Sequence, residues 1–177
     1  MNIENYISQV VKDAKTASRA VASAGAIAKN AALNNIAEGI IAATAVLKSE
    51  NEKDVLAAQQ AGLSEAIIDR LRLTDNRIKA MAEGVRQIIG LPDPVGQIIS
   101  GHTRPNGLQI QKVRVPLGVI VIIYESRPNV TADAAALCLK AGNAVILRGG
   151  KESIHSNVAI YRILASSLEK AGLDKRC

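Results

Sequence analysis

The 177-residue sequence contains no phenylalanine and no tryptophan, and its only aromatic side chains are Tyr6, Tyr124 and Tyr161. A hydrophobic core must therefore be built from alanine, isoleucine, leucine and valine, which pack through many small contacts rather than a few large ones. The length suits one domain, since domains cluster at roughly 100 to 200 residues.

Cysteine is also scarce. The two cysteines, Cys138 and Cys177, have no CxxC or histidine spacing around them, which argues against a disulfide framework and a zinc site. His102 and His155 each lack a partner at catalytic or metal-binding spacing, so solvated histidines are expected. No metal site is predicted.

Long apolar runs and blocks of one charge are missing too. No stretch reaches the roughly 18 apolar residues of a membrane span, and the amino terminus lacks a signal peptide's basic start, so we expect a cytoplasmic chain without a membrane partner. The net charge of +6 would attract polyanions, but basic residues alternate with acids, as in "KSENEKD". This pattern favours solvated helix faces, and leaves a basic nucleic-acid-binding protein as the less favoured alternative.

Residues 1–92 are rich in alanine and indicate successive helices. Ser64 and Thr74 are predicted N-caps, each followed by an acidic first turn. Gly90 followed by Pro92 predicts the end of the last of these helices.

Residues 93–116 change in character. "GQIISG" and "LQIQKVRV" alternate apolar and polar residues on either side of "RPNG", which predicts a β-hairpin. Asn106 and Gly107 are both residue types that suit the positive backbone angles of hairpin turns.

Residues 117–177 follow the order strand, helix, strand, helix. The runs "LGVIVIIYE" and "NAVILR" are typical of strands buried on both faces. Between them, Asn129 or Thr131 is predicted to cap a helix that Gly142 closes. A last helix is predicted from about Ser153, with an apolar stripe at helical spacing made of Ile154, Val158, Tyr161, Leu164 or Ala165, Leu168 and Ala171.

Two buried strands joined by a helix should be parallel, as at the opening of a doubly wound nucleotide-binding sheet. Ligands of such sheets bind at the carboxyl ends of the strands, here "YESRPN" and "RGGKES". In the second loop, glycines would let a ligand approach the backbone, Arg148 and Lys151 would attract an anion, and Glu152 could accept from ribose hydroxyls. A glycine pair after a strand is equally compatible with an ordinary turn.

The wider pattern is more specific. "PLGVIVIIYESRPNVTADAAALCLKAGNAVILRGGKES", together with "GLSEAIIDRL", "RIKAMAEGVRQI", "LPDPVGQI" and "NGLQIQKVRVPLGV", resembles the amino-terminal part of the gamma-glutamyl phosphate reductases, also called glutamate-5-semialdehyde dehydrogenases, of the aldehyde dehydrogenase superfamily. The resemblance implies an aldehyde dehydrogenase-like α/β fold with an incomplete Rossmann-type parallel sheet. It divides a single, truncated cofactor-binding domain into helical segment 1–92, oligomerisation hairpin 93–116 and first βαβα unit 117–177.

The resemblance also implies an enzyme of proline biosynthesis that uses NADPH to reduce L-glutamyl 5-phosphate to L-glutamate 5-semialdehyde. Asn129 is implied as an oxyanion donor, although a plain helix-capping role is equally open. Arg127 could meet a substrate anion or only a neighbouring acid. The implied cofactor-binding residues are Tyr124, Glu125, Ser126, Arg127, Arg148, Gly149, Gly150, Lys151 and Glu152.

Family members continue beyond the similarity, which ends at Leu173, with further strands and the catalytic cysteine. Cys138 lies between leucines in a predicted helix, where burial raises a thiol pKa, so it is not expected to be the nucleophile. The resemblance therefore implies a chain that is inactive alone, with a nucleotide-binding fragment without catalysis as the alternative. It further implies homo-oligomers and transfer of the labile substrate from glutamate 5-kinase.

Overall fold

The computed structural model describes residues 2–177, and over this range helices precede a hairpin and a small βαβα unit. In the first part lie helices α1 (Ile3–Ser23), α2 (Ala26–Ala42), α3 (Thr44–Gln60), α4 (Glu65–Leu71) and α5 (Asp75–Gly90). Strands β1 (Ile98–Thr103) and β2 (Gln109–Val113) follow. The chain then forms β3 (Val119–Ile123), α6 (Asn129–Lys140), β4 (Ala144–Arg148), the short 3₁₀ helix η1 (Lys151–Ser153) and α7 (Ile154–Lys170).

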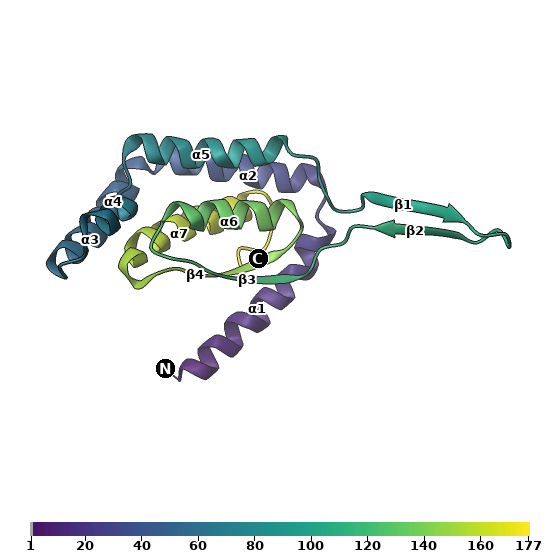
Figure 1. The fold of residues 1–177 in the computed structure, drawn as a ribbon, viewed down its shortest axis with the longest axis horizontal. Helices are drawn as coiled ribbons and strands as arrows, with labels where there is room; N and C mark the ends of the chain where they lie inside the picture. The colour runs from purple at the N-terminus through teal and green to yellow at the C-terminus, as the bar shows by residue number, and fades with distance from the viewer. Residues whose placement is uncertain (1) are drawn as a thin grey trace.

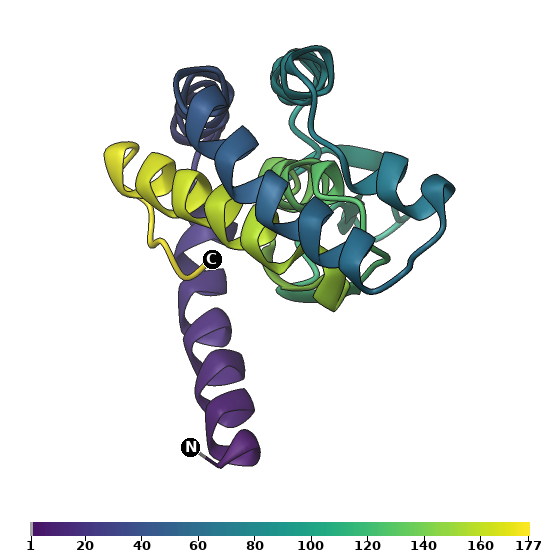
Figure 2. The same cartoon turned by 90° about the vertical axis from the view of Figure 1, so that its left-hand side faces the viewer.

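The elements are stacked in layers. Helices α2 and α5 lie side by side and cover α6 and α7, which in turn cover the sheet of β3 and β4 (Figure 1). Helix α3 runs along α7 near its start, and α1 extends away from the body at its amino end (Figure 2). None of the helices in residues 2–177 is both long enough and apolar enough to span a bilayer.

Helix α5 begins and ends where the sequence predicts. The Thr74 hydroxyl accepts a hydrogen bond from the backbone N–H of Arg77 at 3.2 Å, and the helix ends at Gly90. Ser64 occupies the N-cap position of α4, but its side chain makes no capping hydrogen bond.

The start of α6 differs from the prediction. Helical backbone angles begin at Pro128, which takes the N-cap position without a side-chain bond, so neither Asn129 nor Thr131 is a cap. At the other end Gly142, at φ +74°, closes the helix as predicted, and the N–H of Asn143 reaches the carbonyl of Cys138 at 2.9 Å.

The hairpin of β1 and β2 is antiparallel and projects from the body (Figure 1). Its turn is closed by a 2.9 Å bond from the N–H of Gly107 to the carbonyl of Arg104, and Gly107 has φ +85°. The prediction of a positive φ at Asn106 is wrong, because this residue uses its side-chain oxygen to accept from Leu108 N–H at 3.1 Å. Every residue of both strands is exposed.

Strands β3 and β4 are parallel, with Ile123 opposite Arg148, as the strand, helix, strand order predicts. The prediction that β3 is buried on both faces is wrong, because Val121 is 60% and Ile123 is 73% exposed. Within residues 2–177 each strand pairs only with the other, and α1 touches β4 more extensively than β3. The outward residues of β3 therefore have no covering element in the described chain.

The main core lies between the helical layers rather than under the sheet. It is continuous from α2 and α5 through α6 to α7, and is built from alanine, valine, leucine, isoleucine and one methionine. Leu33, Ile36, Ile78, Val85 and Ile160 are all at most 1% exposed. The helices therefore pack closely on alanine, and this close packing fills the core without large aromatic side chains.

Two buried lysines fasten α2 to the end of α6. The ammonium of Lys29, 1% exposed, lies 2.6 Å from the Asp93 carboxylate and donates to the carbonyl of Lys140 at 3.2 Å. The Lys140 ammonium donates to Asn30 Oδ1 at 2.8 Å and to the carbonyl of Ile89 at 2.9 Å. Burial lowers the pKa of Lys140, with Asp93 opposing this effect and Lys29 adding to it.

Replacing Asp93 with asparagine should lower the free energy of unfolding by about 3 kcal/mol, because the Lys29 ammonium would remain buried without its counter-charge. Urea unfolding measures the change. Glu83→Gln is the control, since Glu83 forms an exposed pair with Arg86 at 3.6 Å, and it should have little effect. Equal losses in the two variants would contradict a special role for the buried pair.

The same pair should show its own pH dependence. Burial works to raise the pKa of Asp93, but the bonds from Lys29 and the Val95 N–H outweigh it, so this pKa lies below 3.8. A depressed carboxyl pKa contributes stability above its unfolded value, and that contribution is lost as the pH falls through the folded value. The difference between wild type and Asp93→Asn should therefore shrink in acid below about pH 4.

Candidate functional site

The carboxyl ends of β3 and β4 lie next to each other, at the end of the molecule that carries α3 and α4 and away from the hairpin (Figure 1). The N–H of Tyr124 donates to the carbonyl of Arg148 at 3.1 Å, which continues the ladder one step past β3. The two loops that hold most of the predicted cofactor residues therefore start in contact. This adjacency follows from the parallel register.

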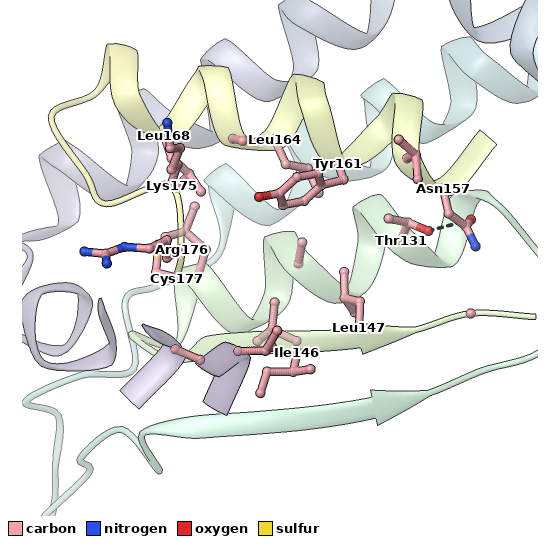
Figure 3. Close-up of a pocket in the computed structure, with 18 of the residues that line it drawn as sticks. Thr131, Ile146, Leu147, Asn157, Tyr161, Leu164, Leu168, Lys175, Arg176 and Cys177 are labelled. Carbon is pink, nitrogen blue, oxygen red and sulfur yellow. Dashed lines mark hydrogen bonds between the residues drawn. The ribbon is translucent and has the colours of Figure 1, made fainter. Parts of the chain in front are cut away.

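A chain of side-chain hydrogen bonds joins the first loop to α6 and α7. The Thr131 hydroxyl donates to Asn157 Oδ1 at 3.0 Å (Figure 3). The Tyr124 hydroxyl lies 2.6 Å from the Thr131 hydroxyl and is therefore the donor to it. Asn157 Nδ2 donates to the Ser153 hydroxyl at 3.0 Å, and that hydroxyl donates to the carbonyl of Gly150 at 3.2 Å. Burial raises the pKa of Tyr124, with the Thr131 bond opposing it, so the phenol stays protonated at neutral pH.

Gly149 and Gly150 are required by close contact and not by backbone angle, since neither has a positive φ. A Cβ on Gly149 would overlap the Asn157 amide and lie 3.0 Å from the ring and hydroxyl of Tyr124. A Cβ on Gly150 would overlap the Ser126 hydroxyl and lie 2.8 Å from Glu152 Oε2. The space that the glycines leave is taken by side chains of the protein itself.

The loop that follows β4 carries the charged side chains of the site. The Ser126 hydroxyl donates to Glu152 Oε2 at 2.6 Å, and this bond is the main cause of a lowered pKa at Glu152, so the group is a carboxylate at neutral pH. Arg148 and Lys151 are exposed, and within residues 2–177 neither side chain has a hydrogen-bond or ion-pair partner. The loop thus presents two available cations beside one fixed carboxylate.

Helix α3 holds the start of α7 in place through the buried side chains of Asp54 and Asn51, a connection that no local pattern predicts. The Asp54 carboxylate accepts from the N–H of His155 at 3.1 Å, and from the N–H and hydroxyl of Ser156 at 2.8 and 2.6 Å. Asn51 donates to the Ser156 hydroxyl at 3.0 Å and to the carbonyl of Leu71 at 2.8 Å. Asp54 therefore satisfies two of the free N–H groups at the start of α7, those of His155 and Ser156.

A cavity of about 480 Å³ extends from the strand ends along β4, between α1 and α7 (Figure 3). All three tyrosines of the chain, Tyr6, Tyr124 and Tyr161, line it. The predicted apolar stripe of α7 faces this cavity, with Ile154 53% and Tyr161 52% exposed. The stripe is therefore only partly buried, with Leu164 and Leu168 as its buried members.

The buried side of α7 is instead formed mainly by small residues. Ser156, Ala159, Ile160 and Ser167 are buried there, where α7 packs on α2 and α3. Small side chains allow helices to approach closely, so this face is buried despite its lower hydrophobicity. The helical pattern identified an apolar face correctly but did not identify its neighbour.

Arg127 and Asn129 lie in a second cleft of about 440 Å³ on the other side of the loop that follows β3. Its remaining charged lining residues are Arg70, Arg72 and Arg77 from the α4–α5 region, and Asp133 from α6. The Asn129 amide donates to Asp133 Oδ2 at 3.0 Å. The predicted site residues are therefore divided, with Tyr124 and Gly149 lining one cavity and Arg127 and Asn129 the other.

The remaining candidates have simpler surroundings. Glu125 lies 3.9 Å from Arg70 in an exposed pair. Cys138 is buried, and burial raises its pKa. Burial also raises the pKa of Cys177, to about 11. The described residues contain no group of three or more histidine, cysteine, aspartate or glutamate side chains that could hold a metal ion.

Replacing Gly149 with alanine should cost about 2 kcal/mol of unfolding free energy, because the added methyl group must displace Asn157 or Tyr124. Urea unfolding tests this expectation. Gly90→Ala is the matched control, since a Cβ there meets nothing within 4 Å and alanine favours helix more than glycine does. A Gly149→Ala variant as stable as Gly90→Ala would contradict the close contact.

Comparison with protein-family models gave no match. Among curated proteins, the chain is 55% identical over 175 residues to gamma-glutamyl phosphate reductase of Geobacter metallireducens, covering 99% of this chain and 42% of that protein. It is 50% identical over 173 residues to the enzyme of Clostridium novyi, covering 98% and 42%. The chain thus spans less than half the length of these relatives.

Solved structures agree with these sequence similarities. Gamma-glutamyl phosphate reductase of Thermotoga maritima matches 95% of this chain and 41% of its own, with a TM-score of 0.93 and 39% identity. The Saccharomyces cerevisiae protein of the same name matches 92% and 41%, with a TM-score of 0.87 and 30% identity. A probable aldehyde dehydrogenase from Listeria monocytogenes, 16% identical over 97% of this chain and 35% of its own, shares the fold at a TM-score of 0.68.

The chain is thus similar over nearly all of its residues to one part of the gamma-glutamyl phosphate reductases, and it has the corresponding part of the aldehyde dehydrogenase fold.

Proposed function

We propose that the chain is the part of a gamma-glutamyl phosphate reductase that holds NADPH during the reduction of L-glutamyl 5-phosphate to L-glutamate 5-semialdehyde, a step of proline biosynthesis. The relatives that carry this enzyme name support the assignment. The structural observation that carries it is the direct contact between the carboxyl ends of β3 and β4, with available cations on the second loop. We place the enzyme in the cytoplasm.

The residues of the second loop fit the proposed cofactor. Arg148 and Lys151 supply positive charge for its phosphates, and the Glu152 carboxylate, oriented by Ser126, can accept from ribose hydroxyls. When bound, NADPH supplies a hydride. The bonded chain from Tyr124 through Thr131 to Asn157 keeps the two strand ends together, so the charged loop holds its position without the cofactor.

The nucleophile of the proposed reaction is not one of the two cysteines in this chain. A cysteine nucleophile acts as a thiolate, which requires a depressed pKa and access to substrate. Burial raises the pKa of both Cys138 and Cys177. We therefore propose that these 177 residues alone have no reductase activity.

We also propose that the enzyme is a homo-oligomer whose subunits meet through the exposed hairpin. Both of its strands are fully exposed, and Ile98, Ile110 and Val113 add apolar surface to them. Within residues 2–177 each of these strands pairs only with the other, and free outer edges of this kind favour pairing with another chain. Direct transfer of the labile acyl phosphate from glutamate 5-kinase would suit the same chemistry.

NADPH should bind the purified chain, and the double change Arg148→Ala with Lys151→Ala should weaken binding by about tenfold, because two charges next to the phosphates are lost. NADPH fluorescence titration at fixed ionic strength measures the affinity. Lys79→Ala removes one exposed charge from α5, outside both clefts, and should change little.

Equal weakening by Lys79→Ala, or no NADPH binding at all, would contradict the proposed cofactor site. Salt-sensitive binding to unrelated DNA without any response to NADPH would instead favour the nucleic-acid alternative that the charge of +6 leaves open. NADPH binding without any role in reduction by the longer enzyme would favour a nucleotide-binding module.

The chain alone should show no NADP-dependent oxidation of glutamate 5-semialdehyde in the presence of phosphate, because neither thiol is activated. Absorbance at the NADPH wavelength measures the reaction, with a full-length relative as positive control. Turnover that Cys138→Ala abolishes would overturn this expectation and make that buried thiol the nucleophile.

A further inference from the structure

The second cleft, which we call the arginine cleft, has walls from two distant parts of the sequence. Arg70, Arg72 and Arg77 come from the α4–α5 region, and Arg127 and Asn129 come from the turn between β3 and α6. This cleft shares the turn with the tyrosine-lined cavity, because Tyr124 belongs to the cavity and Arg127 to the cleft. Four arginines therefore gather one loop away from the proposed cofactor site.

Two of these arginines have structural partners. Arg77 donates to the carbonyl groups of Asp69 and Arg72, the second at 3.0 Å, and pairs with the Asp69 carboxylate at 2.9 Å. Arg70 lies 3.9 Å from Glu125. Arg77 thus fixes the backbone that carries Arg72, and Arg70 faces the start of the loop that follows β3.

The other two, Arg72 and Arg127, are available. Among residues 2–177 neither guanidinium has a hydrogen-bond or ion-pair partner, and both are exposed in the cleft. A guanidinium presents a planar fork of N–H donors that matches a carboxylate or a phosphate. Arginines gathered without partners in a concave surface are suited to such a ligand.

Negative charge in the cleft is weak. Asp133 is the carboxyl group among the described lining residues, and it accepts a bond from Asn129. Burial raises the pKa of Asp133, with the Asn129 bond opposing this effect, which weakens its tendency to ionise. The positive end of the 12-residue helix α6 lies at the same place. Charge, donors and helix direction therefore all favour an anion.

We propose that the arginine cleft binds an anionic end of the substrate, a phosphate or a carboxylate, through Arg72 and Arg127. Anion binding follows from the cleft itself, whereas naming the ligand as the acyl phosphate substrate rests on the proposed function. Substrate and cofactor then approach the end of β3 from opposite sides of one turn. Arg77 acts as a positioning residue, because it holds the backbone of Arg72.

The test uses the purified chain and two simple probes, inorganic phosphate and glutarate, at constant ionic strength. NMR titration follows the backbone amides of residues 127–133 and the arginine side-chain N–H groups. We expect saturable shifts at these positions. Arg72→Gln and Arg127→Gln should each weaken binding by about tenfold, since each removes a charge-assisted contact.

Two further variants control for charge and for folding. Arg162→Gln removes the same charge from an exposed position on α7 that lines neither cleft, and should leave the affinity unchanged. Arg127→Lys keeps the charge but loses the fork, and should weaken binding by less than Arg127→Gln. Circular dichroism and urea unfolding confirm that each variant is folded.

The results distinguish a phosphate ligand from a carboxylate ligand, and they test the arginine cleft separately from the proposed cofactor site. Tighter binding of phosphate assigns the cleft to the phosphoryl end, and tighter binding of glutarate assigns it to a carboxylate end. Arginine-dependent anion binding without any NADPH binding would support the cleft while contradicting the proposed cofactor site. Absence of saturable shifts, equal loss in Arg162→Gln, or loss of NADPH affinity in Arg72→Gln and Arg127→Gln would overturn the inference.

Discussion

The site depends on the ability of two strand ends to touch. Tyr124 can lie over Gly149, and Ser126 can reach Glu152 across Gly150, because neither glycine carries a Cβ. Larger residues would separate the loops, and the hydrogen-bonded path from Tyr124 to α7 would be broken. Glycine is therefore a packing requirement within the protein, while the cations that would meet a ligand are its neighbours in the sequence.

Two buried polar clusters hold the helical layer to the βαβα unit at opposite ends. Lys29, Asp93 and Lys140 join α2 to the end of α6, at the amino side of the sheet. Asp54 and Asn51 of α3 join the start of α7, at the carboxyl side. Since the apolar core is also continuous between these parts, the helices before the hairpin support the βαβα unit that carries the proposed cofactor site.

The sequence predicted features that depend on local chemistry. The cap at Thr74, the stop at Gly142, the hairpin and the parallel βαβ order all follow from a few adjacent residues. Features that depend on residues distant in the sequence were predicted wrongly or not at all. Val121 was predicted to be buried and is exposed, and the buried face of α7 was not predicted. The arginines of the α4–α5 region resembled ordinary solvated helix charge, because nothing local indicates that Arg127 lies across from them.

The tyrosine content has a consequence for measurement. With no tryptophan or phenylalanine in the chain, its near-ultraviolet absorbance and intrinsic emission come from Tyr6, Tyr124 and Tyr161, and all three line the cavity between α1, β4 and α7. Among residues 2–177, none that lines the arginine cleft is aromatic. Unlabelled protein therefore carries a built-in optical reporter of one cavity, and a ligand that enters the other should leave that signal almost unchanged.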